Sequence, residues 1–337
     1  MKKVLTQMLK TKRLWLYLLF SAFFLVQCLP IQAVNQPLPD RDIVFQLDTH
    51  YTGGGEDRIG FINADGSGET YLYTVKVAAV VEPIWTDDGN LLLFVNPADY
   101  IEGITQEGFR MRLEGSYWVP NISPIHGKEE VLIESSHEDR YVIKRIDLNS
   151  GEVLEIYQVC KYKIDDPDDT PEGISLGTNN LYNQQLLYER WWVSEKSVIH
   201  AELIVLNTDT NERHILLENR GDEQNTPYIM NPAFSLDGQW IAYTANDGIY
   251  LIRSDGSENH QIVKSEIVNL GYWPPVASWS PDGQWIVYHR CMLNDKESCR
   301  YNVEDSTIFK YNIETGEEIP LVEGGVNPYW RWREESP

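Results

Sequence analysis

Short apolar runs separated by turn residues repeat along most of the chain. The most regular copies, at 83–94, 232–243 and 277–288, align without gaps, and each places an Asp-Gly pair between two apolar runs. Asp-Gly between such runs predicts a β-hairpin, because glycine adopts positive φ without steric cost. Looser copies at 121–133 and 173–188 predict two further hairpins of the same kind.

A second hairpin is predicted downstream in each unit, because two strand-like runs around a turn pair recur there. The six predicted turns are Asp65-Gly66, Glu114-Gly115, Ser150-Gly151, Thr210-Asn211, Asp255-Gly256 and Thr315-Gly316. No stretch keeps the apolar period of a helix over several turns, so few helices are expected.

The two ends of this repeat are incomplete in a matching way. The strand predicted at 42–47 has no opening strand before it, and the strand at 327–331 has no partner after it. Pairing them completes a sixth unit and closes a ring with about 50 residues per unit, the size of a four-stranded propeller blade. A β-sandwich also uses many short strands but does not predict such ends. We therefore expect an all-β protein, a six-bladed β-propeller over residues 34–337.

The repeats resemble a known family. The segment from Trp279 to Tyr288 (Trp-Ser-Pro-Asp-Gly-Gln-Trp-Ile-Val-Tyr) is similar to the TolB-type, WD-like propeller repeat. The resemblance covers nearly the whole chain after residue 33; it is specific at 232–260 and 277–316 and loose at 120–190. It implies a six-bladed propeller in the bacterial cell envelope. It does not carry over the role of TolB, which has an additional α/β domain ahead of its propeller, whereas fewer than ten residues separate Ala33 from the first predicted strand here.

Residues 1–33 have the layout of a secretory signal peptide. Basic residues precede an apolar run at 14–26, and Ala33 offers a small residue for cleavage. Two alternatives remain open: an uncleaved membrane anchor, because 14–31 is near the shortest span of a bilayer, and lipid attachment at Cys28, whose preceding residues match a lipobox only in part. All three place residues 34–337 outside the cytoplasm, in the periplasm, secreted, or anchored facing outward.

The cysteines fit an oxidising compartment. Cys291 and Cys299 flank a polar loop between two strand-like runs, and we predict a disulfide between them. No Cys or His pair at zinc spacing accompanies them, so metal binding is disfavoured. Cys160 follows an apolar run and is expected to be a buried free thiol.

The net charge of the chain limits the classes of partner that it is expected to bind. The chain has 28 Lys and Arg against 51 Asp and Glu, a formal net charge of −23. Such acidity repels phosphate backbones, so nucleic acid is not expected as a partner. A monomer is expected, and contact with a membrane only through an uncleaved anchor or a lipid on Cys28.

No catalytic constellation is recognised. Gly173-Ile-Ser-Leu-Gly177 matches the G-x-S-x-G nucleophile elbow, but Ser175 falls in an opening strand with no α/β domain around it. The seven histidines show no metal-ligand spacing; His289 is the best single candidate, and a hydrogen-bonded structural histidine is the favoured interpretation.

One acidic run could hold a cation. Clustered carboxylates can bind Ca²⁺, but the run lacks the spacing of a calcium loop, so a solvated acidic loop is favoured. Its carboxylates are Asp165, Asp166, Asp168 and Asp169. No other metal or cofactor is expected.

The predicted topology separates two ends of the propeller. The Asp-Gly-type turns share one end, and the long connections predicted at 96–108, 158–172, 189–198, 265–276 and 290–306 share the other. Loops on a rigid scaffold concentrate binding residues. The aromatic residues there that do not follow the repeat are Tyr100, Trp191, Trp192, Tyr272 and Trp273.

These features predict a binding module for an envelope protein, peptide or glycan, with Tyr100, Trp191, Trp192, Tyr272, Trp273 and His289 as candidate contacts. Three alternatives remain open. The aromatic rings could only pack loops against blades. The chain could be a propeller enzyme, a lyase or hydrolase acting on a glycan or lactone. It could also be a purely structural envelope component, because propellers host unrelated functions.

Overall fold

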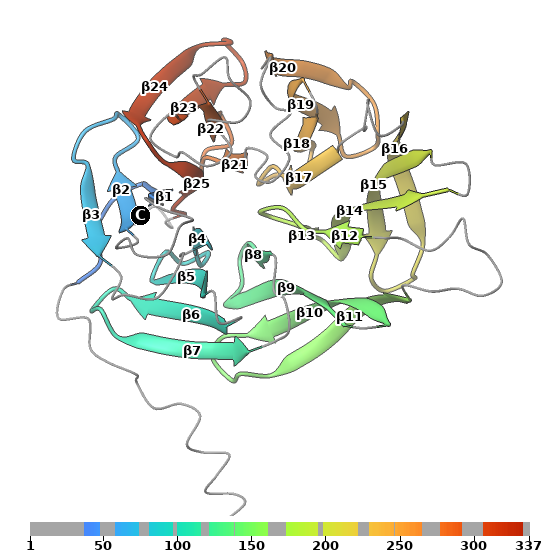
Figure 1. Cartoon of the computed structure of the whole chain (residues 1–337), viewed down its shortest axis with the longest axis horizontal. Coiled ribbons are helices and arrows are strands. Elements are labelled where there is room, and N and C mark those ends of the chain that lie inside the picture. Colours follow the sequence, from blue (N-terminus) through green and yellow to red (C-terminus); the bar gives the residue numbers. More distant parts are fainter. Residues whose placement is uncertain are drawn as a thin grey trace, which may run out of the picture.

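Six β-sheets surround a central axis in the computed structural model (Figure 1). It describes residues 37–47, 58–73, 81–96, 100–115, 121–137, 139–160, 173–194, 198–221, 229–245, 247–264, 277–291 and 306–332. All the regular secondary structure in these ranges is β-strand, which confirms the all-β prediction. Among these residues no helix long and apolar enough to cross a membrane is found.

Each sheet is one blade, numbered 1–6 along the chain. Blade 1 joins β25 (Val326–Trp330), β1 (Ile43–Leu47), β2 (Arg58–Ile62) and β3 (Thr70–Tyr73). Blade 2 contains β4 (Val81–Trp85), β5 (Leu91–Asn96), β6 (Tyr100–Thr105) and β7 (Arg110–Gly115). Blade 3 contains β8 (Ile122–Pro124), β9 (Glu130–Ser136), β10 (Arg140–Asp147) and β11 (Val153–Cys160).

The remaining blades follow the same antiparallel order. Blade 4 contains β12 (Gly173–Ser175), β13 (Leu181–Tyr182), β14 (Gln185–Val193), β15 (Ile199–Asn207) and β16 (Arg213–Gly221). Blade 5 contains β17 (Ile229–Phe234), β18 (Trp240–Ala245), β19 (Gly248–Arg253) and β20 (His260–Lys264). Blade 6 contains β21 (Ser278–Trp279), β22 (Trp285–Cys291), β23 (Ser306–Asn312) and β24 (Glu318–Glu323).

The ring closes within blade 1, as predicted. β25 pairs antiparallel with β1, with Ile43 opposite Trp330 and Val44 opposite Tyr329. Tyr329 and Trp330 are each 4% exposed, so the last strand is part of the core. The two ends of the described chain therefore hold each other by backbone pairing and by aromatic burial.

The first-hairpin turns of blades 5 and 6 are built by the same hydrogen bonds. Ser235 Oγ donates to Asp237 Oδ1 at 2.6 Å, and the backbone N–H of Trp240 donates back to Ser235 Oγ at 3.0 Å. Ser280 and Asp282 repeat this arrangement at 2.5 Å in blade 6. Gly238 and Gly283 follow at φ 67°, a value that favours glycine. The sequence motif thus determines the turn chemistry directly.

Large side chains pack between neighbouring blades. Trp85 and Trp279 are essentially fully buried. The indole Nε1 of Trp279 donates to the carbonyl oxygen of Ala233 in blade 5 at 3.1 Å. Arg331 lies over the ring of Trp85, 4.5 Å from its centre, and so joins the end of blade 1 to blade 2. The tryptophans that recur in the opening strands therefore serve packing.

Two predicted boundaries in blade 2 are wrong. Glu114-Gly115 lies in β7, and the blade 2 turn falls instead near Gly108, whose φ of 87° meets the need of that turn for glycine. The stretch 96–108 was predicted as one long connection but contains β6. The other five second-hairpin turns lie where predicted, between β2 and β3, β10 and β11, β15 and β16, β19 and β20, and β23 and β24.

Candidate functional site

Blade 4 departs from the repeat after its opening strand. In place of a tight Asp-Gly turn, residues 176–180 form a fully buried segment, here called the central segment, that reaches toward the middle of the ring (Figure 1). The central segment hydrogen-bonds to three other blades. Thr178 Oγ1 donates to Ala277 O in blade 6 at 3.2 Å, and Asn179 Nδ2 donates to Phe234 O in blade 5 at 2.9 Å. The backbone N–H of Asn180 donates to Ser123 Oγ in blade 3 at 3.0 Å.

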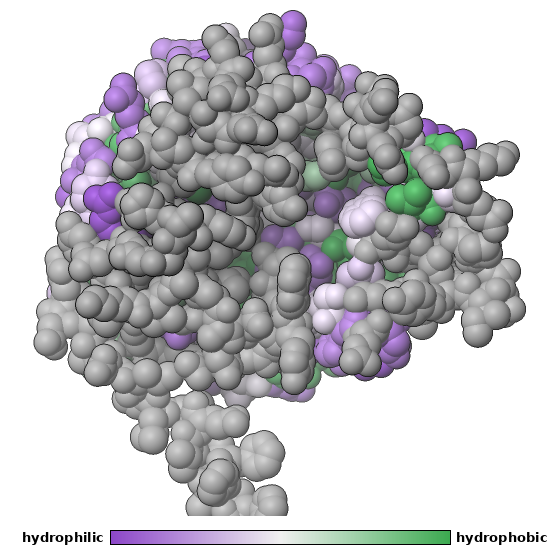
Figure 2. Space-filling view, viewed as in Figure 1, coloured by the Kyte–Doolittle hydropathy of each residue, from purple (hydrophilic) through white to green (hydrophobic). Residues whose placement is uncertain are grey.

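A small pocket lies beside the central segment on the axis. It encloses about 320 Å³ including its open side, and no lining residue is charged. The lining residues are Pro83, Ile84, Asn121, Ile122, Gly177, Thr178, Asn231, Asn327, Pro328 and Tyr329. Figure 2 shows this hollow at the centre of the ring, lined by both hydrophilic and hydrophobic residues. The pocket therefore suits a neutral polar group, which amides and hydroxyls can bind from several sides.

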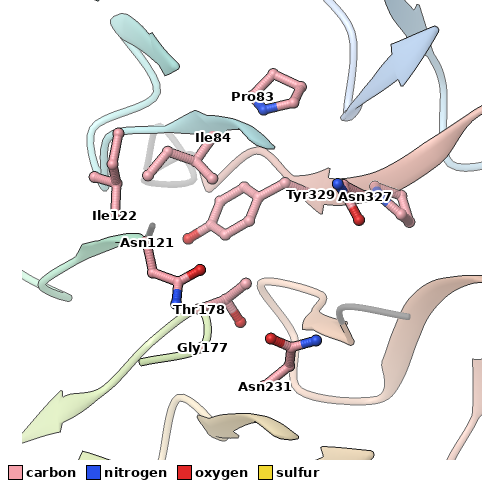
Figure 3. Close-up of a pocket in the computed structure, with 10 residues that line it drawn as sticks. Pro83, Ile84, Asn121, Ile122, Gly177, Thr178, Asn231, Asn327 and Tyr329 are labelled. Atoms are coloured by element: carbon pink, nitrogen blue, oxygen red, sulfur yellow. The ribbon is translucent and has the colours of Figure 1, made fainter. Parts of the chain in front are cut away.

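The ring of Tyr329 crosses this pocket. It points from β25 toward Asn121 (Figure 3). Burial, and next the negative charge of Asp87, raise the pKa of Tyr329 far above its ordinary value. Its hydroxyl therefore stays protonated at physiological pH and acts as a neutral hydrogen-bonding group.

An Asn-Pro bulge turns two amides toward the axis. Asn231 and Asn327 each precede a proline and have φ values of 52° and 50°, a region that asparagine tolerates better than most residues. Strand pairing shifts register at both places. A bulge re-aims side chains locally, and here both asparagines line the pocket.

A polar position recurs in the second strand of five blades. It directly follows the residue, mostly aromatic, that faces the blade core, and its side chains are 1–8% exposed. These side chains are Gln46, Glu134, Glu189, Thr244 and His289. The sequence analysis named only His289. Aligning the second strands by their aromatic residue would have identified four of the five, and Glu134 follows Ile133 at the equivalent place.

Two of these polar residues, His289 and Glu134, connect neighbouring blades. His289 lies inside β22 and is 6% exposed, and its Nδ1 accepts a hydrogen bond from the backbone N–H of Asn327 in blade 1 at 3.2 Å. Asn327 Nδ2 in turn donates to Gln46 Oε1 at 3.2 Å. Glu134 Oε2 accepts from the backbone N–H of Leu176 in blade 4 at 3.3 Å. The position of His289 agrees with a structural histidine, and its binding role stays a prediction.

Four polar side chains gather between blades 3 and 4. Asn121 Nδ2 donates to Ser175 Oγ at 2.7 Å and lies 3.4 Å from Glu134 Oε2. Ser175 is the cross-strand partner of Glu189. Burial, and next the charge of Glu134, raise the pKa of Glu189 well above its ordinary value. Ser175 therefore belongs to a sheet ladder, as predicted, and not to a strand–turn–helix elbow.

The two adjacent tryptophans of blade 4 lie in β14, not in a connection between strands as predicted. Trp192 is 8% exposed, stacks on His200 with ring centres 4.6 Å apart, and lies 4.9 Å from Arg190. Arg190 also pairs with Glu202 at 2.5 Å. These cross-strand pairs extend the ladder with β15, so the strand continues through both rings. Trp192 is thus a packing residue in this structure.

Trp191 faces the other side of the same strand. It is 40% exposed, and a side chain at Gly173 would overlap its indole, so the ring lies directly over the first residue of β12. Both residues sit at the end of blade 4 opposite the tight turns, here called the loop end. Trp191 is the one predicted contact that the structure shows as both described and exposed.

Several predicted residues lie outside the described part of the chain. These are Cys28, the acidic residues Asp165, Asp166, Asp168 and Asp169, the aromatics Tyr272 and Trp273, and Cys299. The side chains of Tyr100, Cys160 and Cys291 are likewise not described, although their backbone lies in strands. In the described ranges no group of three or more His, Cys, Asp or Glu is placed to hold a metal ion.

Comparison with solved structures gives the class of fold. TolB from Acinetobacter baumannii superposes with a TM-score of 0.64 at 13% identity, over 87% of this chain and 67% of that one. A protein assigned as TolB from Agrobacterium tumefaciens gives a TM-score of 0.56 at 15% identity, over 82% and 92%. A chain of the nidogen/laminin complex gives 0.57 at 9% identity, over 86% and 98%.

The fold is therefore a TolB-like six-bladed propeller, as the repeats predicted. No protein-family profile matches the sequence, and no curated protein is similar to it in sequence. At these identities the structural similarity establishes the fold alone.

Proposed function

We propose that this chain is an extracytoplasmic binding module that recognises an envelope protein, peptide or glycan at the loop end. The observation that carries the proposal is Trp191, a large aromatic ring that is 40% exposed on a nine-residue strand. Trp supplies much contact area with few torsions to freeze, which suits it to an interface anchor. The strand that carries the ring does not need to be ordered on binding, because β14 pairs along its length with β15.

Other features of the chain favour recognition of a polar partner. The neutral central pocket adds amides and a phenol that both donate and accept hydrogen bonds. The net charge of −23 disfavours acidic partners and supports basic or neutral ones. The N-terminal pattern supports an extracytoplasmic location. The similar nidogen/laminin chain shows that a propeller of this shape occurs in a protein complex.

Affinity capture from an envelope extract tests the proposal. Trp191→Ala should recover at least tenfold less partner than the wild-type chain, since anchor tryptophans contribute about 2 kcal/mol or more. Ile215→Ala is the matched control, because Ile215 is 53% exposed at the tight-turn end of the same blade. Equal capture by both variants and the wild type, with all three folded, would place the binding site elsewhere.

A propeller enzyme acting on a glycan or lactone is the second candidate. The observation that favours it is the pair of buried carboxyl groups, Glu134 and Glu189, because burial, and next the charge of Glu134, raise the pKa of Glu189 well above its ordinary value. Turnover of a panel of oligosaccharides and lactones by the wild type, lost in Glu189→Gln, would support catalysis. A wild-type chain that releases no product from the panel would leave binding as the function.

A further inference from the structure

The polar side chains between blades 3 and 4 form two cross-strand pairs. Ser175 is opposite Glu189 in the β12–β14 ladder. The backbone N–H of Glu134 donates to Asn121 O at 3.3 Å, which places these two residues opposite each other in blade 3. Side chains of directly opposed residues project to the same face of a sheet. The 2.7 Å contact of Asn121 Nδ2 with Ser175 Oγ then joins the two pairs into one cluster.

Glu189 is unsatisfied in this cluster. The side chain is 8% exposed, and its Oε2 atom is buried without a hydrogen-bond partner. An ionised carboxylate here would place a second negative charge near Glu134 in a largely buried site. The buried Oε2 lacks a hydrogen-bond partner whichever protonation state the carboxyl takes.

We propose that Glu134 and Glu189, with the Ser175 hydroxyl and the Asn121 amide oxygen, bind one divalent cation between blades 3 and 4, with Ca²⁺ as the preferred ion. All four donors are oxygens once the Asn121 amide is turned by 180°, which interchanges its oxygen and nitrogen positions. Hard cations such as Ca²⁺ take carboxylate, carbonyl and hydroxyl or water ligands, whereas zinc and copper prefer nitrogen and sulfur.

A bound cation would compensate the negative charges of Glu134 and Glu189 in a region of low dielectric, and would also give the unpartnered Oε2 atom of Glu189 a partner. Asn121 also lines the central pocket, which provides a route from solvent to the cluster. Because the ligands come from two blades, the ion stabilises their interface. This inference goes beyond the proposed function and does not depend on it.

Calcium titration of the purified full-length chain tests the site. After treatment with EDTA, isothermal titration with CaCl2 should show one equivalent bound, and 1 mM Ca²⁺ should raise the Tm by several degrees. Glu189→Gln should lose at least tenfold in affinity and most of the Tm shift. Glu155→Gln, which makes the same charge change on the exposed strand β11, should behave as the wild type.

The outcomes separate the proposal from its rivals. No heat and no Tm shift with Ca²⁺, Mg²⁺ or Mn²⁺ would overturn it. Undiminished binding by Glu189→Gln would also overturn it and would point to an ion held elsewhere in this acidic chain. If Glu189→Gln fails to fold, Ser175→Ala replaces it, since that change removes one ligand without altering charge. Wild-type affinity in Ser175→Ala would then contradict the assignment.

Discussion

Blades 5 and 6 differ from blade 4 in how the chain continues after the opening strand. In blades 5 and 6 a Ser-x-Asp-Gly turn returns the chain within four residues, and Asp237 and Asp282 make the same bonds. In blade 4 the central segment leaves the sheet, bonds to three other blades, and rejoins through β13. The regular blades therefore build the ring, whereas the irregular blade fills its centre and carries the exposed Trp191.

The buried carboxyl groups and the central pocket both lie next to the irregular blade 4. The buried carboxyls of Glu134 and Glu189 meet where the irregular blade adjoins blade 3. The central pocket is bordered by Gly177 and Thr178 of the same segment. A departure from a repeat thus indicates a candidate site better than the repeat itself does.

The largest expected effect is on ring closure, on which both kinds of blade depend. Deleting residues 325–337 removes β25 with the buried rings of Tyr329 and Trp330, each of which contributes about 3–5 kcal/mol on the scale of large-to-small core substitutions. We expect loss of cooperative thermal unfolding, measured by circular dichroism. Deletion of only 333–337 is the control. A 325–337 deletion that keeps the full-length Tm would refute the closure.

The central segment should be the next most sensitive feature. Asn180 is fully buried, and its Nδ2 donates to Leu187 O at 2.8 Å and to Pro232 O at 3.0 Å. Asn180→Ala leaves two buried carbonyls unpaired, which should lower the free energy of unfolding by about 2–4 kcal/mol. Urea denaturation measures this, with Asn149→Ala in an exposed turn as the control. Equal midpoints for the two variants would show that the segment does not hold the blades.

Substitutions at two equivalent glycines test the contact between blades 4 and 5. Gly238 and Gly283 occupy the same turn position at φ 67°, but a Cβ at 238 would overlap the ring of Tyr182 in β13, whereas a Cβ at 283 meets nothing within 4 Å. Gly283→Ala should cost about 1–2 kcal/mol from backbone strain alone. Gly238→Ala should cost about 1–3 kcal/mol more, because Tyr182 must move. Identical losses in urea melts would argue against the contact between blades 4 and 5.

A further expected effect concerns Glu189 and pH in metal-free buffer. Its pKa is raised in the folded chain, so above about pH 4.5 the folded state keeps a proton that the unfolded state loses. Unfolding free energy therefore falls as pH rises toward the folded pKa, by about 1.4 kcal/mol per pH unit from this group. Glu189→Gln should lose less stability than the wild type between pH 4.5 and 7 in the presence of EDTA. Parallel stability curves would mean that Glu189 is not buried as a neutral acid.

The scaffold could be predicted from the sequence because its signals are local. The Asp-Gly turns at 237–238 and 282–283 carry their own hydrogen-bonding side chain and their own glycine. The pairing of β1 with β25 could be predicted because each of these strands lacks a partner in the repeat unit at its own end of the chain.

The site could not be predicted in the same way, because it depends on long-range contacts. Nothing near Leu176 in the sequence indicates that its N–H meets Glu134. The two tryptophans were predicted in a loop because they break the repeat, yet Arg190–Glu202 and Trp192–His200 pairing keeps them in β14. The length of that strand depends on its partner β15 as much as on its own residues.

Site-specific photocrosslinking tests the central claim most directly. A photoreactive phenylalanine analogue replaces Trp191 in one variant and Ile215, on the tight-turn end of blade 4, in another, and both are irradiated in intact cells. We predict one discrete crosslinked species from position 191 and none from position 215. Adducts from position 215 alone, or none from either position in folded protein, would contradict the assignment of the loop end of blade 4 as the binding surface.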